Sequence, residues 1–114
     1  MNFKWSVFMA DLNPVIGSEQ QGKRPVLVIS DETTNSVMPV VTILPITSLK
    51  KGRRIYPNEV LLKQGVAGLD TDSIILAHQI RTISKQRLLN CRGTITEETL
   101  QTMINDALRV HLNL

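Results

Sequence analysis

One stretch of the sequence, Glu19–Ser30, constrains the fold more than any other. It joins a polar loop to an unbroken aliphatic run, Val26–Ile29, which is typical of a central β-strand covered on both faces. Pro25 fixes its own φ and disfavours the α region for Arg24, so the arginine enters the strand extended. The stretch therefore predicts a cation held at the mouth of a rigid strand, as a site for anions requires. An ordinary solvated arginine at a strand edge fits this stretch equally well.

Composition indicates a single globular domain, residues 1–114. Hydrophobic residues make up 42% of the chain, which argues against disorder. The lone cysteine, Cys91, excludes a disulfide framework, and we expect it to be a small buried apolar residue. The two histidines, His78 and His111, stand far apart, so we expect neither a metal site nor a cofactor. Since the chain lacks both a membrane-spanning apolar run and a signal peptide, we expect a cytoplasmic protein without a membrane partner.

Positive charge is clustered along the chain. The formal net charge is +3 and the pI is about 9.4. Lys23 stands beside Arg24, and a second group crowds one short loop, called here the basic loop: Lys50, Lys51, Arg53 and Arg54. Such clusters favour polyanions, although a charge run is more often a solvated loop between strands. Aromatic residues amount to 4% of the chain, so any nucleic acid would be held mainly by charge, hydrogen bonds and shape.

The predicted elements are strands first and one long helix last. The strands are expected over residues 4–12, 25–30, 40–47, 59–62, 73–83 and 91–94, with loops at 15–23 and 31–36 and a helical turn at 85–89. The loop at 15–23 is long for so small a domain, which is typical of functional loops. Pro45 cannot donate a ladder hydrogen bond, so Thr47 and Ser48 are expected where the sheet becomes irregular.

The strand predicted over residues 73–83 carries several polar side chains. If the strand is regular, Gln79 and Arg81 share one face, and His78 points away from them unless a bulge intervenes.

Residues 96–112 predict an amphipathic helix. Thr96 offers an N-cap, and Glu97 and Glu98 face the positive end of the helix dipole. An apolar stripe recurs at helical spacing and is interpreted as core packing: Leu100, Met103, Ile104, Ala107, Leu108 and Leu112. The expected fold is mainly β (α+β), an SH3-like small β-barrel with a C-terminal amphipathic helix.

An ordered set of short motifs runs through this chain. Asp11-Leu12-Asn13-Pro14, Gly17-Ser18-Glu19-Gln20 and the run from Gly22 to Ser30 are followed by Leu44-Pro45-Ile46-Thr47-Ser48, Gln79-Ile80-Arg81-Thr82-Ile83 and Arg87-Leu88. In order and spacing, this set resembles the MazF/PemK (Kid) family of toxins over nearly the whole chain.

The resemblance implies a metal-independent endoribonuclease toxin of a toxin–antitoxin pair. Such toxins cut single-stranded RNA, usually mRNA, at short sequences by attack of the RNA's own 2′-hydroxyl, leaving a cyclic phosphate and a 5′-hydroxyl. They work as homodimers with RNA along the dimer interface, and a cognate antitoxin lays an acidic segment across that groove. By resemblance, Arg24 is the catalytic arginine and Thr47 the catalytic threonine. Ser18, Glu19, Gln20 and Gln79 match positions near or contacting RNA.

The chemistry of these residue types agrees with that role. The forked Arg24 cation suits two phosphate oxygens, and the Thr47 hydroxyl can orient the same phosphate. Further RNA contacts are expected from Lys23, Ser48, Lys50, Lys51, Arg53 and Arg81. The general base stays open. Glu19 has the right type and position but stands near an arginine, which weakens a carboxylate as a base. His78 is the other candidate, although a lone strand histidine is more often structural.

Some positions depart from the family pattern. Trp5-Ser6 stands where a Gly-Asp pair is usual, Met9 where a tryptophan is common, and Leu76 where some relatives carry an arginine.

Two alternatives to an endoribonuclease toxin remain open. One is a non-enzymatic toxin on the same barrel, as in the related gyrase poisons, which act through a tryptophan-containing C-terminal end; this chain ends in His111-Leu112-Asn113-Leu114. The other is a degenerate homologue that kept the fold as an interaction module.

Overall fold

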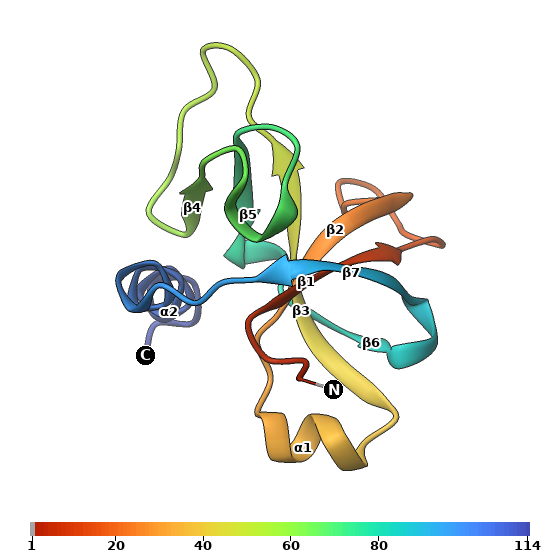
Figure 1. The fold of residues 1–114 in the computed structure, drawn as a ribbon. Helices are drawn as coiled ribbons and strands as arrows, with labels where there is room; N and C mark the ends of the chain where they lie inside the picture. Colours follow the sequence, from red (N-terminus) through yellow and green to blue (C-terminus); the bar gives the residue numbers. More distant parts are fainter. Residues whose placement is uncertain (1) are drawn as a thin grey trace.

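The structure is a computed structural model that describes residues 2–114 (Figure 1). Short 3-10 helices, labelled η, interrupt the strands. In chain order the elements are β1 (Ser6–Asp11), β2 (Lys23–Val28), α1 (Glu32–Val37), β3 (Val40–Ser48), β4 (Glu59–Leu62), η1 (Val66–Gly68), β5 (Ser73–Leu76), η2 (Ala77–Gln79), β6 (Arg81–Ser84), η3 (Lys85–Arg87), β7 (Leu88–Thr94) and α2 (Glu98–Leu112).

The strands form one antiparallel sheet in the order β4-β5-β3-β2-β1-β7, with β6 also paired to β3. Strand β3 connects the two parts of the sheet, because it pairs with β2 and β6 along its first part and with β5 along its last. The expectation of a mainly β fold with a C-terminal helix is confirmed. The barrel is open, since the edge strands β4 and β7 do not pair with each other in the described part of the chain.

Buried side chains form two clusters, one on each face of β2. Leu27 belongs to the first cluster, which also holds Ile104 and Ala107 of α2. Val26 and Val28 belong to the second cluster. The prediction that the strand after Arg24 is covered on both faces is therefore confirmed.

The strand predicted over residues 73–83 is interrupted. Strand β3 advances three residues from Ile46 to Ile43, whereas its partners advance six, from Ile75 to Arg81. The three extra residues form η2, Ala77–Gln79. Simple alternation therefore does not apply here: the strand is not regular, and the irregularity left open in the prediction for His78 is present as η2.

The segment 31–36, expected to be a loop, contains helix α1. Asp31 caps it by accepting a hydrogen bond from the Thr34 N–H at 3.0 Å. The Glu32 carboxylate accepts hydrogen bonds from the Phe3 and Lys4 amides, and the fully buried Asn35 donates to the Ser30 carbonyl at 2.8 Å. These local polar contacts stabilise a helix too short for a periodic apolar pattern to reveal.

The C-terminal helix agrees with its prediction in part. It begins at Glu98 with Glu97 as N-cap and no side-chain capping bond, so Thr96 is not the cap. Ile104 and Ala107 are buried, and Leu100 and Leu108 pack beside them on the first cluster, but Met103 and Leu112 are about half exposed. Cys91, expected to be buried, is exposed on the edge strand β7. Within residues 2–114 no helix is long and apolar enough to cross a membrane.

Candidate functional site

Arg24 lies in β2, opposite Ala10 of β1. Strand alternation places its side chain on the face of Val26 and Val28, which is the face of the second cluster. Its Nε donates a hydrogen bond to the Gln21 carbonyl at 2.7 Å. This bond steadies the guanidinium and uses only one edge of it, so the fork formed by the two terminal nitrogens is left for an anion.

Thr47 lies where β3 parts from β2. The paired register ends at Val26–Pro45, and from Ile46 onward β3 pairs with β5. Extending the β2–β3 register by two residues brings Thr47 opposite Arg24 and onto the same face. Strand alternation therefore places both side chains on the same face, at the point where β3 leaves β2 and pairs with β5, and Thr47 is half-buried there.

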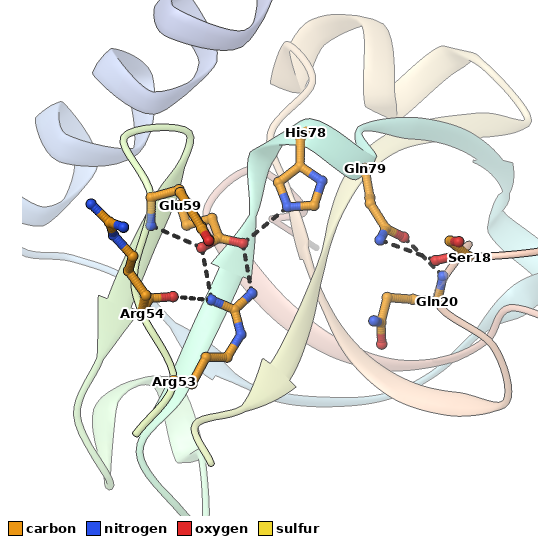
Figure 2. A network of polar contacts seen from close by, with 8 residues as sticks. Ser18, Gln20, Arg53, Arg54, Glu59, His78 and Gln79 are labelled. Carbon is orange, nitrogen blue, oxygen red and sulfur yellow. Dashed lines mark hydrogen bonds and ion pairs between the residues drawn. The ribbon is translucent and has the colours of Figure 1, made fainter. Parts of the chain in front are cut away.

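The β1–β2 loop, residues 12–22, is fastened over this region by side chains from distant parts of the chain. Gln79 accepts a hydrogen bond from the Gln20 amide at 2.8 Å and donates one to the Ser18 carbonyl at 3.3 Å (Figure 2). Arg81 Nη1 reaches the Leu12 carbonyl at 3.5 Å, and Arg87 Nη1 donates to the carbonyl of Asn13 in the loop and to that of Asp11 at the end of β1, the latter at 3.1 Å. The loop is therefore held by four separate contacts at both of its ends.

A hollow of about 360 Å³ opens between this loop and η2, and is called here the loop-side hollow. Ser18, Glu19, His78, Gln79 and Ile80 line it. The three residues inserted as η2 bring His78 and Gln79 to the same hollow, which a regular strand would not. Glu19 Oε1 accepts the Ile16 amide hydrogen at 2.8 Å, so one oxygen of this carboxylate already serves the fold of its own loop.

A second polar cluster lies on the other side of His78 and is centred on Glu59 of β4. The Glu59 carboxylate accepts hydrogen bonds from both terminal nitrogens of Arg53, at 3.0 and 2.7 Å, and from the Tyr56 amide at 3.0 Å. His78 Nε2 lies 3.0 Å from its Oε2 (Figure 2). The side chain is only 2% exposed. Its hydrogen bonds with Arg53 lower the pKa of Glu59 to about 2.

A family model described as the PemK-like, MazF-like toxin of type II toxin–antitoxin systems matches residues 4–112. The chain belongs to this family. It is 39% identical over 108 residues to endoribonuclease EndoA of Bacillus subtilis (strain 168), covering 95% of this chain and 91% of that protein. It is 40% identical over 108 residues to endoribonuclease MazF of Staphylococcus epidermidis, covering 95% and 88%.

Solved structures of the family share the fold. An endoribonuclease from a mycobacterial species, solved in complex with its cognate antitoxin, superposes with a TM-score of 0.81 at 24% identity, over 100% of this chain and 97% of that one. MazF from Deinococcus radiodurans (Form-I) gives 0.77 at 25% identity, over 97% and 96%. The family predicted from the sequence motifs is thus confirmed, and the enzyme class expected agrees with the names of these relatives.

The predicted site residues of this MazF-like chain do not all lie together. Arg24 and Thr47 share a face where β3 parts from β2, and the loop-side hollow joins Ser18, Glu19, His78 and Gln79, with Gln20 fastened beside it. Lys23, Arg24 and Ser48 border a second hollow of about 360 Å³, beside Asp70 and Arg92. Lys50 and Lys51 are exposed on the basic loop, which spans residues 49–58 between β3 and β4 (Figure 1). Three of the predicted RNA contacts are already engaged within the chain: Arg53 with Glu59, Gln79 with the Gln20 amide and the Ser18 carbonyl, and Arg81 with a backbone carbonyl.

Glu59 was missed by the sequence analysis. It occupies the first position of an apolar strand, Glu59–Leu62, and a glutamate in such a run needs a buried cationic partner. That pattern was the available signal, but it does not say which arginine or histidine is the partner. Among residues 2–114 no three His, Cys, Asp or Glu side chains form a group that could hold a metal ion.

Proposed function

We propose that this protein is a sequence-selective, metal-independent endoribonuclease toxin that cleaves single-stranded RNA. In the cell, this substrate is mRNA. The observation that carries the proposal is that strand alternation puts Arg24 and Thr47 on one face where β3 parts from β2. Arg24 is also bonded to the β1–β2 loop, which Gln79 fastens beside His78. The endoribonuclease relatives at 39% and 40% identity support the same reaction class.

The proposed reaction is an in-line attack of a 2′-oxygen on the adjacent phosphorus. The P–O5′ bond breaks, which leaves a 2′,3′-cyclic phosphate and a 5′-hydroxyl. The Arg24 fork holds two phosphate oxygens and stabilises the charge that develops on them, while the Thr47 hydroxyl orients the same phosphate. A base takes the 2′-hydroxyl proton, and water returns one to the departing 5′-oxygen. Because the nucleophile belongs to the substrate, DNA is not cut.

His78 and Glu19 are the two candidates for the base, since both line the loop-side hollow. We favour His78. A carboxylate oxygen of Glu19 is bound within its own loop, whereas an imidazole exchanges protons readily near neutral pH. RNA contacts are assigned to Ser18, Gln20, Lys23, Ser48, Lys50, Lys51, Gln79 and Arg81, with Arg53 acting through the position of the basic loop.

The proposal extends to partners. We propose a homodimer of single-domain chains, acting in the cytoplasm, with RNA along the dimer interface, and a cognate antitoxin that covers the same groove with an acidic segment. A net charge of +3 and the exposed basic loop favour an acidic ligand. The solved complex of a mycobacterial relative with its cognate antitoxin is a precedent for such a partner.

The test is cleavage of a long single-stranded RNA by purified protein in EDTA, with mapped ends. Wild type should cut at a short sequence and leave 5′-hydroxyl ends, and a DNA version of the substrate should stay intact. Arg24→Lys keeps the charge but loses the fork, so the rate should fall on the order of 10²–10³-fold. Arg109→Lys is the matched control, because the Arg109 side chain pairs with its neighbour Asp106 on α2, and it should cut normally.

Two outcomes would contradict the proposal. Equal cutting by Arg24→Lys would remove Arg24 from the chemistry. Failure of folded wild type to cut any of several RNAs would favour a non-enzymatic toxin or an interaction module on the same fold.

A further inference from the structure

Glu59 is a buried charge with every acceptor position occupied. Three N–H groups come from the basic loop, two from the Arg53 guanidinium and one from the Tyr56 amide. The fourth contact is His78 Nε2, from η2. Removing an ion from water in this way is costly unless it is fully hydrogen-bonded, and this arrangement meets that requirement. The carboxylate is thus held rigidly and ionised at neutral pH.

The ionised carboxylate determines how His78 carries its proton. An ionised carboxylate only accepts hydrogen bonds, so Nε2 must donate to it. In the neutral ring Nδ1 is then the atom with the free lone pair. Figure 2 shows this nitrogen on the side of Gln79 and Ser18, away from Glu59. His78 lines both the loop-side hollow and a hollow beside Val110 and His111 of α2, and its side chain is 31% exposed. Because Nδ1 lies on the side of Gln79 and Ser18, which line the loop-side hollow, we assign it to that hollow.

We propose that Glu59 is a positioning residue that makes His78 Nδ1 the proton acceptor of the RNA cleavage reaction. The inference rests on the proposed function. The 2′-hydroxyl proton passes to Nδ1 as the 2′-oxygen bonds to phosphorus and the P–O5′ bond breaks. The Glu59 carboxylate holds the ring in one orientation and stabilises the imidazolium that forms.

The same carboxylate links the two loops of the site. On one side Arg53 and Tyr56 attach the basic loop to Glu59, and on the other His78 precedes Gln79, which fastens the β1–β2 loop. The charged or titratable groups that face His78 from the packed elements are Glu59 of β4, Arg53 and Tyr56 of the basic loop, Glu19 of the β1–β2 loop and His111 of α2.

The test is a double-mutant cycle on single-turnover cleavage at saturating RNA. His78→Gln should lower the rate constant on the order of 10²-fold, as expected for loss of a general base. Glu59→Gln should lower it roughly 10-fold, and saturating RNA keeps any loss of affinity from a displaced basic loop out of the measured rate constant. If Glu59 acts through His78, the double variant should be no slower than His78→Gln. The acid limb of the rate–pH profile should move to lower pH in Glu59→Gln, because the imidazolium loses its carboxylate, and should be absent in His78→Gln.

Glu32→Gln is the matched control. Glu32 is also a hydrogen-bonded carboxylate, but its donors are the Phe3 and Lys4 amides, which precede β1. It should cut at the wild-type rate. Additive losses in the cycle, or an unmoved acid limb in Glu59→Gln, would overturn the inference while leaving the nuclease intact; no cutting by wild type would instead overturn the proposed function. Should Glu59→Gln not fold, ¹⁵N NMR of the wild-type protein shows which nitrogen of His78 carries the hydrogen. The His78 signals are assigned by comparison with His111→Asn, which removes those of His111. Hydrogen on Nε2 supports the inference, and hydrogen on Nδ1 overturns it.

Discussion

At the residue scale, Glu59 carries a buried charge that is costly to remove from water and that four hydrogen bonds compensate. Its carboxylate is nearly inaccessible to water, yet it carries a charge that two terminal nitrogens of Arg53 and a backbone amide compensate. Breaking such a pair on one side leaves an uncompensated buried charge, which costs several kcal/mol. The stability of the chain should therefore depend on pH through this residue.

We expect Glu59 to contribute to acid unfolding. Its pKa is lowered from 4.5 in the unfolded chain to about 2 in the folded one. A lowered folded pKa stabilises the protein fully above pH 4.5, and the stabilisation is lost as pH falls toward 2. The shift corresponds to on the order of 3 kcal/mol of stability.

Urea unfolding of wild type and Glu59→Gln at pH 7 and near pH 3 measures this contribution. The pKa values of Asp31 and Glu32 are also lowered, by hydrogen bonds from Thr34 and from the Phe3 and Lys4 amides, so wild type loses stability from several groups. The difference between the two proteins isolates Glu59 and should shrink at low pH. A difference that is the same at both pH values would contradict the lowered pKa.

At the scale of elements, the turn η1 packs unusually closely on the edge strand β7. A Cβ built on Gly68 would lie 2.3 Å from the Arg92 carbonyl oxygen, and one on Gly93 would lie 2.7 Å from the Ala67 carbonyl carbon. Arg92 closes the contact by donating to the Gly68 carbonyl at 2.7 Å and to Asp70 at 3.1 Å. Backbone therefore lies against backbone, and only glycine permits it.

Gly68→Ala and Gly52→Ala form a matched pair that separates close packing from backbone strain. Both glycines have positive φ, +74° and +77°, but a Cβ on Gly52 would meet nothing within 4 Å. Gly52→Ala should cost about 1–2 kcal/mol from strain alone. Gly68→Ala should cost a further ~1–3 kcal/mol because β7 must move. Urea unfolding measures both, and equal losses would show that η1 and β7 separate freely.

Elements that have a local sequence pattern could be predicted from the sequence, and elements set by distant contacts could not. The run Val26–Ile29 and the largely apolar first strand that precedes Asn13-Pro14 carry local signals, so β1 and β2 were expected nearly in place. Helix α1 and turn η2 carry none, because each is set by hydrogen bonds to residues elsewhere, such as Glu32 to the Phe3 amide. For the site, motif order predicted Arg24 and Thr47 as the catalytic pair, but the direction of His78 depends on the insertion at η2, and its pairing with Glu59 joins positions nineteen residues apart.

Across the whole molecule, some cationic side chains are exposed to solvent and others are engaged by groups of the chain itself. Lys50 and Lys51 project into solvent on the basic loop, whereas Arg53, two residues further, is neutralised by Glu59. Arg81 and Arg87 are likewise turned toward backbone carbonyls of the β1–β2 loop. The net charge of +3 therefore does not reveal which cations remain free for RNA phosphates.

The salt dependence of RNA binding distinguishes free cations from engaged ones. Each phosphate neutralised on single-stranded RNA contributes about −0.7 to the slope of log K against log salt concentration. Lys51→Gln should reduce the slope by about this amount, since its ammonium is exposed. Arg53→Gln should leave the slope unchanged while lowering stability, because its guanidinium serves Glu59. The measurement is a titration over a range of salt with RNA that lacks the 2′-hydroxyl at the cleaved nucleotide, and Arg109→Gln is the surface control. A slope reduced as much by Arg53→Gln as by Lys51→Gln would mean that Arg53 leaves Glu59 to bind a phosphate directly.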